Sequence, residues 1–126
     1  MNTNNNPINF YIVVNIDCGI EKGKVHAHVG HATQALCEYY YSTLVNSPGE
    51  FKKLIKLYKE WTDTGSAKIV LKASQFDFNL LKKEKPLCVI KDAGHTQINP
   101  GTETVLAFFP MYKYNGSVIL QSLKLL

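Results

Sequence analysis

A short polar connection between two apolar runs is the feature that most constrains this chain. The runs 87–90 and 105–109 are brief and rich in β-branched or aromatic residues, as expected of buried strands. The segment between them is too short to contain a crossover helix, so the two strands are predicted to be antiparallel or non-adjacent. Residues 90–104 nevertheless hold carboxylates, a histidine, a glutamine, two glycines and three threonines. Polar groups at strand ends are commonly used for binding and catalysis.

Strands and helices are predicted in alternation along the rest of the chain. Residues 8–16 are almost continuously apolar, which indicates a central strand, and residues 67–73 form the second strand. Apolar periodicity and breaker residues predict helices over 22–46, 51–61, 75–83 and 115–121. The order β-α-α-β-α-β-β-α predicts an α/β fold, with one mixed sheet of four strands and helices on both faces.

Length and composition limit the domain organisation and the cellular setting. The chain of 126 residues fits one domain, so we predict a single domain over 8–126 after a short disordered tail, 1–7. No apolar run approaches the ~18 residues of a membrane span, and the N-terminus lacks the features of a signal peptide. Three cysteines without metal-like spacing indicate reduced thiols. A cytoplasmic protein without membrane association is therefore expected.

The basic residues permit a nucleic-acid partner without requiring one. All 14 are lysines, and the net charge is +4. Lysine is a mobile point charge that suits phosphate, whereas arginine gives planar bidentate recognition. A lysine row at 52, 53, 56 and 59 is compatible with phosphate contacts, but also with an ordinary solvated helix face.

Two polar junctions, 17–31 and 92–104, are predicted to meet in one crevice, because strand ends at one sheet edge gather together. The helix N-terminus at Lys22-Gly23-Lys24 suits a phosphate or a developing oxyanion. Asp92 follows a buried strand directly, so it either sits desolvated and ionised beside a lysine or caps the turn through Gly94. The threonines Thr96, Thr102 and Thr104 could position a water or a ribose hydroxyl, or simply reflect strand propensity.

Two other hydrolase chemistries stay open on the residues alone. His28 and His31 share a helix face, and His26 and His95 could approach them, but a zinc site needs a more complete ligand set. Cys18 could in principle pair with a histidine as nucleophile and base.

Five blocks of this sequence resemble one known family in the same order. They are Lys22-Gly23-Lys24-Val25, Gly30-His31-Ala32, Lys68-Ile69-Val70-Leu71-Lys72, residues 92–106 and Leu123-Lys124-Leu125-Leu126. The most specific block combines Asp-Ala-Gly-His-Thr-Gln-Ile with Pro-Gly-Thr-Glu-Thr-Val-Leu. Together they resemble the type-2 peptidyl-tRNA hydrolases of archaea and eukaryotes, in register from about residue 10 to residue 126.

The resemblance implies a three-layer α/β/α sandwich, often dimeric, that cleaves the ester between a peptide and the tRNA 3′ end. It implies contact with the acceptor stem and no metal or organic cofactor. Transferred by position, the implied catalytic residues are Lys22, Asp92, Thr96 and Thr104. The implied substrate contacts are Lys24, His28, His31, Gln97 and Thr102.

Three positions depart from the family pattern. A small residue is usual where this chain has His26, a glutamine where it has His28, and a serine or alanine where it has Gly30. These changes leave open how the site binds substrate and depends on pH. The alternative to an active hydrolase is a tRNA-binding or protein-interaction module of the same fold.

Overall fold

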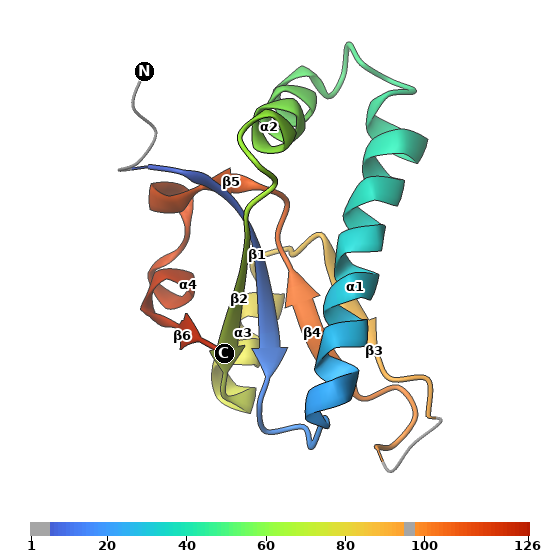
Figure 1. Ribbon diagram of the computed structural model, residues 1–126, viewed down its shortest axis with the longest axis vertical. Helices are drawn as coiled ribbons and strands as arrows, with labels where there is room; N and C mark the ends of the chain where they lie inside the picture. The colour runs from blue at the N-terminus through green and yellow to red at the C-terminus, as the bar shows by residue number, and fades with distance from the viewer. Residues whose placement is uncertain (1–5, 95–97) are drawn as a thin grey trace.

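One mixed six-stranded sheet runs through the protein in a computed structural model that describes residues 6–94 and 98–126 (Figure 1). Its strands are β1 (Ile8–Asn15), β2 (Lys68–Ala73), β3 (Cys88–Lys91), β4 (Glu103–Ala107), β5 (Met111–Tyr112) and β6 (Lys124–Leu125). The order is β3-β4-β1-β2-β6, and β5 pairs with the start of β1. β1 and β2 are parallel, whereas β4 is antiparallel to both β1 and β3.

β1 is the central strand, and all eight of its residues are buried. Because side chains alternate along a strand, its residues supply both cores of the protein. Phe10 and Ile12 belong to one hydrophobic cluster, and Tyr11 and Val13 belong to the other. The prediction of a central first strand is therefore confirmed.

Helices cover the two faces of the sheet unequally. The first cluster contains residues of α1 (Lys22–Tyr39) and α2 (Lys52–Asp63), and α1 continues into a π-helical turn, Tyr40–Leu44. The second contains residues of the shorter helices α3 (Gln75–Lys82) and α4 (Val118–Ser122). A 3-10 turn, Lys113–Asn115, precedes α4. Figure 1 shows α1 as the long helix that crosses the sheet, with its N-terminus beside the lower ends of β3 and β4.

The α/β class is confirmed, and of the two arrangements left open for β3 and β4, antiparallel or non-adjacent, the structure has the antiparallel pair. The predicted count of four strands is wrong. β5 and β6 have two residues each, which is too short for alternation to be visible in the sequence. β6 arises because the C-terminal residues pair with β2 and cover its otherwise open edge. The predicted sandwich thus differs in detail, with six strands and a thin second helical layer.

A polar network fixes the turn that leads from β1 into α1. The buried Asn15 side chain donates to Gln75 Oε1 (2.8 Å) and accepts from the Asp17 backbone N–H (3.0 Å). Asp17 in turn accepts the backbone N–H of Gln75 at the start of α3 (2.8 Å). The start of the β1–α1 connection is therefore held to the start of α3 by three side chains.

Candidate functional site

A β-bulge turns Thr104 toward α1. Ile90 pairs with Val105 and Lys91 pairs with Glu103, so Thr104 is the extra residue on β4 and has no counterpart on β3. Its side chain is fully buried, and its hydroxyl donates to the Ile90 carbonyl oxygen (3.3 Å). The bulge explains why a threonine between two core strands can present its hydroxyl to another element.

Asp92 lies one residue beyond β3 and is almost completely buried, with 2% of its surface exposed. Its Oδ1 pairs with Lys24 Nζ, and its Oδ2 accepts the backbone N–H of Gly94 (2.8 Å). These hydrogen bonds, that of Lys24 first, lower the pKa of Asp92 against the opposing effect of burial. The carboxylate is therefore ionised at neutral pH. Both roles that the sequence left open for Asp92, lysine partner and turn cap, are present together.

The turn after Asp92 needs a glycine at position 94. Gly94 has a φ of +83°, and a Cβ atom there would lie 2.5 Å from Pro100 Cγ. The turn is closed by backbone bonds from Asp92 N–H to Thr102 O (2.8 Å) and from Gly101 N–H to Asp92 O (2.9 Å). The loop thus holds the carboxylate by its own main chain as well as through Lys24.

His28 joins the same cluster from the second turn of α1, and only 5% of its surface is exposed. Its Nδ1 lies 2.5 Å from Thr104 Oγ1, and its Nε2 lies 3.8 Å from Asp92 Oδ1. Burial, helped by His31 and Lys24, lowers the pKa of His28 below 6.5, although Asp92 acts in the opposite direction. The imidazole is therefore neutral at pH 7.

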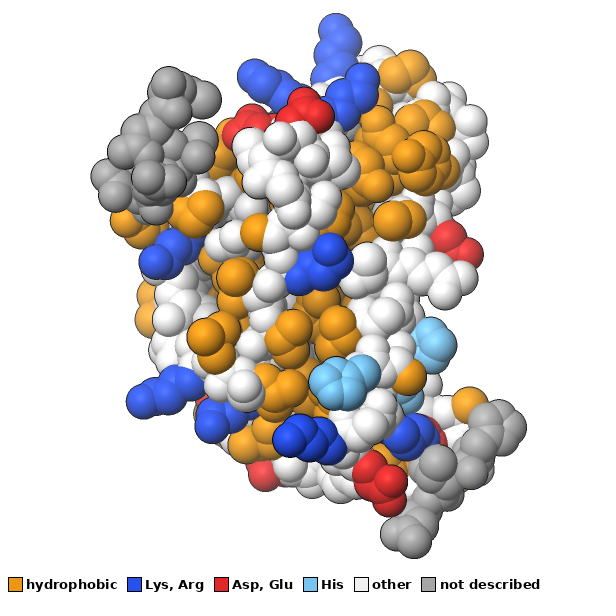
Figure 2. Space-filling model, in the orientation of Figure 1, with side chains coloured by type: hydrophobic (Ala, Val, Ile, Leu, Met, Phe, Trp, Pro, Cys, Tyr) orange, Lys and Arg blue, Asp and Glu red, His pale blue; other side chains and the backbone are white. Residues whose placement is uncertain are grey.

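The two predicted polar junctions do meet, since α1 supplies Lys24 and His28 and the β3–β4 connection supplies Asp92 and Thr104. Figure 2 shows charged and histidine side chains gathered around the lower end of α1. Lys22 is the exposed first residue of this helix, and no ion pair joins it to Asp92 in the described part of the chain.

The remaining predicted site residues lie around this cluster. His31 is exposed, with its ring centroid 5.7 Å from that of His28. The Thr102 hydroxyl donates to the Asn99 carbonyl (2.8 Å), so it supports the turn. Thr96 and Gln97 lie outside the described residues.

Chemically, the cluster combines a buried carboxylate, a cation and two neutral polar groups. Within residues 6–94 and 98–126, no three histidine, cysteine or acidic side chains are arranged to hold a metal ion. Burial raises the pKa of the Cys88 thiol to about 11, so this cysteine is protonated at neutral pH. The arrangement suits orientation of a polar substrate and stabilisation of negative charge.

Two features of the site were not anticipated from the sequence. The bulge at Thr104 depends on backbone geometry, which has no residue signature here. The second is an ion pair between Lys82 of α3 and Glu103, next to Thr104. The turn cap of Asp92, by contrast, was among the expected roles, because Asp followed two residues later by Gly is typical of such turns.

The fold and site define a mixed-sheet α/β protein in which a buried aspartate pairs with a partly exposed lysine near a helix N-terminus. A family model described as "Peptidyl-tRNA hydrolase PTH2" matches residues 8–126. The chain belongs to this family. Among the described residues, no helix is both long and apolar enough to cross a membrane.

Curated relatives agree with the family match. "Peptidyl-tRNA hydrolase" of Saccharolobus islandicus (strain L.S.2.15 / Lassen #1) is 35% identical over 94% of this chain and 99% of its own length. The protein of the same name from Saccharolobus solfataricus is 33% identical over the same shares. "Probable peptidyl-tRNA hydrolase 2" of Dictyostelium discoideum is 34% identical over 90% of this chain, but over 52% of its own length.

Proposed function

We propose that this chain hydrolyses the ester that joins a peptide to the 3′ end of tRNA, releasing the peptide and a reusable tRNA. Family membership and the names of relatives that match over almost their whole length support this activity. The observation that carries it in the structure is the buried Asp92, held ionised by Lys24 beside Thr104 and His28.

An aminoacyl ester is already activated, so the site has to orient a water and stabilise the oxyanion rather than form a covalent intermediate. The lowered pKa of Asp92 makes it a weak proton acceptor. In our proposal Asp92 fixes Lys24 and orients water, and the Lys24 ammonium faces the developing oxyanion. Lys22, at the exposed N-terminus of α1, adds positive charge at the entrance.

The other proposed roles concern substrate contact. Thr96 holds the water or the ribose, and the buried Thr104 supports the site from behind through its contact with His28. His31, Gln97 and Thr102 line the approach of the tRNA 3′ end. Exposed lysines contact the acceptor-stem phosphates, so binding weakens as salt rises. We further propose that residues 8–126 act as one domain and that the protein works in the cytoplasm. We also propose that it forms a homodimer; light scattering after gel filtration measures its mass in solution and tests this directly.

The decisive measurement is release of labelled peptide from an N-blocked aminoacyl-tRNA by the wild type and by Asp92→Asn. The substitution keeps the shape but removes the charge that holds Lys24, so kcat is expected to fall about 10²-fold or more. Unblocked aminoacyl-tRNA is the control substrate and should be hydrolysed poorly. If the wild type binds tRNA without turnover, the proposal fails and the chain is a binding module. If Asp92→Asn keeps full activity, the site assignment fails but the activity stands.

A further inference from the structure

A buried histidine lies where the proposed site has no obvious need for a third titratable group. His28 does not face solvent, as a substrate contact would, because 5% of its surface is exposed. Each of its ring nitrogens instead faces a different residue of the β3–β4 connection, Nδ1 toward Thr104 and Nε2 toward Asp92. The ring thus links α1 to both residues.

One arrangement of protons makes both contacts of the Thr104 hydroxyl hydrogen bonds. Oγ1 lies 3.3 Å from the Ile90 carbonyl oxygen, which can only accept, and 2.5 Å from His28 Nδ1, which can donate or accept. Both contacts are satisfied when the hydroxyl donates to Ile90 and Nδ1–H of His28 donates to the hydroxyl. In this arrangement, Nε2 of the neutral ring has no proton.

A second proton on the ring would land on Nε2 and point at an oxygen that is already in use. Nε2 lies 3.8 Å from Asp92 Oδ1, the same atom that pairs with Lys24 Nζ. A charged His28 therefore competes with Lys24 for Oδ1 and places a second cation beside it. The charged or titratable groups of the described residues that face the ring are Lys24 and His31 from α1 and Asp92 after β3, while β4 presents the uncharged Thr104. Two of these three groups oppose protonation.

From this geometry we infer that His28 is a positioning residue whose neutral ring holds Thr104 and leaves Asp92 to Lys24, so that the site works only while His28 is uncharged. This inference rests on the proposed hydrolase activity. It goes further by assigning to His28 the loss of that activity at low pH. The low pKa of Asp92 cannot supply such a limit near neutrality.

The test compares pH–rate profiles between pH 5 and 7.5 for the wild type, His28→Gln and His28→Ala on the N-blocked aminoacyl-tRNA. The wild type should lose kcat on the acid side with a midpoint below 6.5. Glutamine carries an amide near the Nε2 position but does not titrate, so His28→Gln should lack this limb while keeping part of the rate. Alanine removes both contacts and should lower kcat about 10²-fold with little change in KM, because the site is no longer held in place.

His26→Gln is the matched control, since His26 is an exposed histidine two residues away on the same helix. It should keep both the rate and the acid limb. Proton-nitrogen NMR of the labelled wild type should find His28 protonated on Nδ1 alone at pH 7.

Stability gives an independent reading. Because folding lowers the pKa of His28, the unfolded chain takes up a proton first as pH falls below about 6.5, and the folded state loses stability. The wild-type Tm should therefore fall relative to that of His28→Gln between pH 7 and 5. An acid limb that survives in His28→Gln, or an alanine variant as active as the glutamine one, overturns the inference while the hydrolase activity stands. A wild type without turnover overturns both.

Discussion

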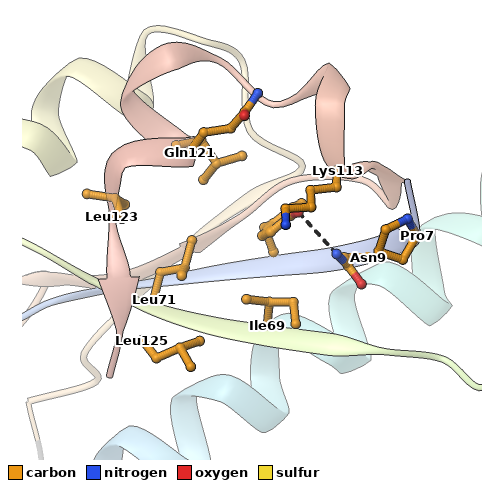
Figure 3. Close-up of a pocket in the computed structure, with 10 residues that line it drawn as sticks. Pro7, Asn9, Ile69, Leu71, Lys113, Gln121, Leu123 and Leu125 are labelled. Carbon is orange, nitrogen blue, oxygen red and sulfur yellow. Dashed lines mark hydrogen bonds between the residues drawn. The ribbon is translucent and has the colours of Figure 1, made fainter. Parts of the chain in front are cut away.

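Two regions on opposite faces of the sheet differ in how they combine space and charge. The cluster of Lys24, His28, Asp92 and Thr104 is closely packed, and its side chains are paired. On the other face, a cavity of about 380 Å³ lies between β1, β2, β6 and α4 (Figure 3). Its walls are mainly apolar, with Leu71, Leu120, Leu123 and Leu125 among them.

Polar groups in the cavity are not organised for chemistry. Asn9 donates to the Tyr11 hydroxyl (3.1 Å), which satisfies two neighbouring residues of one strand. Lys113 reaches the cavity as well, but among the described residues no ion pair joins its ammonium group to a carboxylate. The difference teaches that hollow shape and chemical capacity are separate properties here. Interaction between titratable groups, and not empty volume, marks the site of the proposed reaction.

The largest expected effect on kcat is that of Lys24→Ala, and the matched control is Lys113→Ala in the cavity. Lys24→Ala leaves the buried Asp92 carboxylate without its cation, so kcat for peptide release should fall about 10²-fold or more. Lys113→Ala removes the same kind of side chain from the cavity and should change kcat less than about twofold. Steady-state kinetics on the two variants measures the contrast. Equal losses would mean that the cavity takes part in the reaction and that the distinction between the regions is wrong.

The contrast also shows how far the sequence could predict the site. The meeting of the two polar junctions followed from strand order and was predictable, because Asp92 and Lys24 each lie directly beside an apolar element. The contact of His28 with Thr104 was not, because it depends on the bulge that turns Thr104 toward α1. A bulge shifts register by one residue without changing composition, so nothing in the local sequence announces it.

The fold was predictable to a similar depth. The four longer strands have enough residues for their apolar character to be recognised in the sequence. The almost continuous apolar residues of β1 indicated its central position, and all eight of its residues are buried. β5 and β6 depend on pairing with distant partners, β1 and β2, and so could not be identified from local residues. The cavity is lined by residues of β6, α4 and β2, so it could not be predicted from the sequence without the pairing of β6.

A smaller effect, on stability alone, should follow from Leu120→Ala in α4. Leu120 is 3% exposed, belongs to the second hydrophobic cluster and borders the cavity. Removal of its side chain should lower the free energy of unfolding by about 2 kcal/mol, the low end for such a change because empty space already adjoins it. Urea denaturation gives this value, and kcat at a temperature where the variant is folded should stay within about twofold. A large loss of kcat would connect α4 to the site.

The smallest effect should come from a second ion pair, Lys82–Glu103, which is more exposed than the Lys24–Asp92 pair. Lys82 pairs with Glu103 one residue before Thr104, but their side chains are 34% and 30% exposed, against 22% and 0% for Lys24 and Asp92. Water and salt screen such a pair, so Lys82→Met, which keeps the aliphatic stem, should cost less than about 1 kcal/mol of stability. The loss should shrink further at high salt.

Activity decides what the Lys82–Glu103 pair contributes to the site. If the bulge is held by the β3–β4 pairing and the buried Thr104 bonds, Lys82→Met should leave kcat within about twofold of wild type. A fall comparable to that of Lys24→Ala would show instead that α3 sets the position of Thr104 through Glu103. The functional region would then extend through the sheet to the face that carries the cavity, and residues on both faces would contribute to one site.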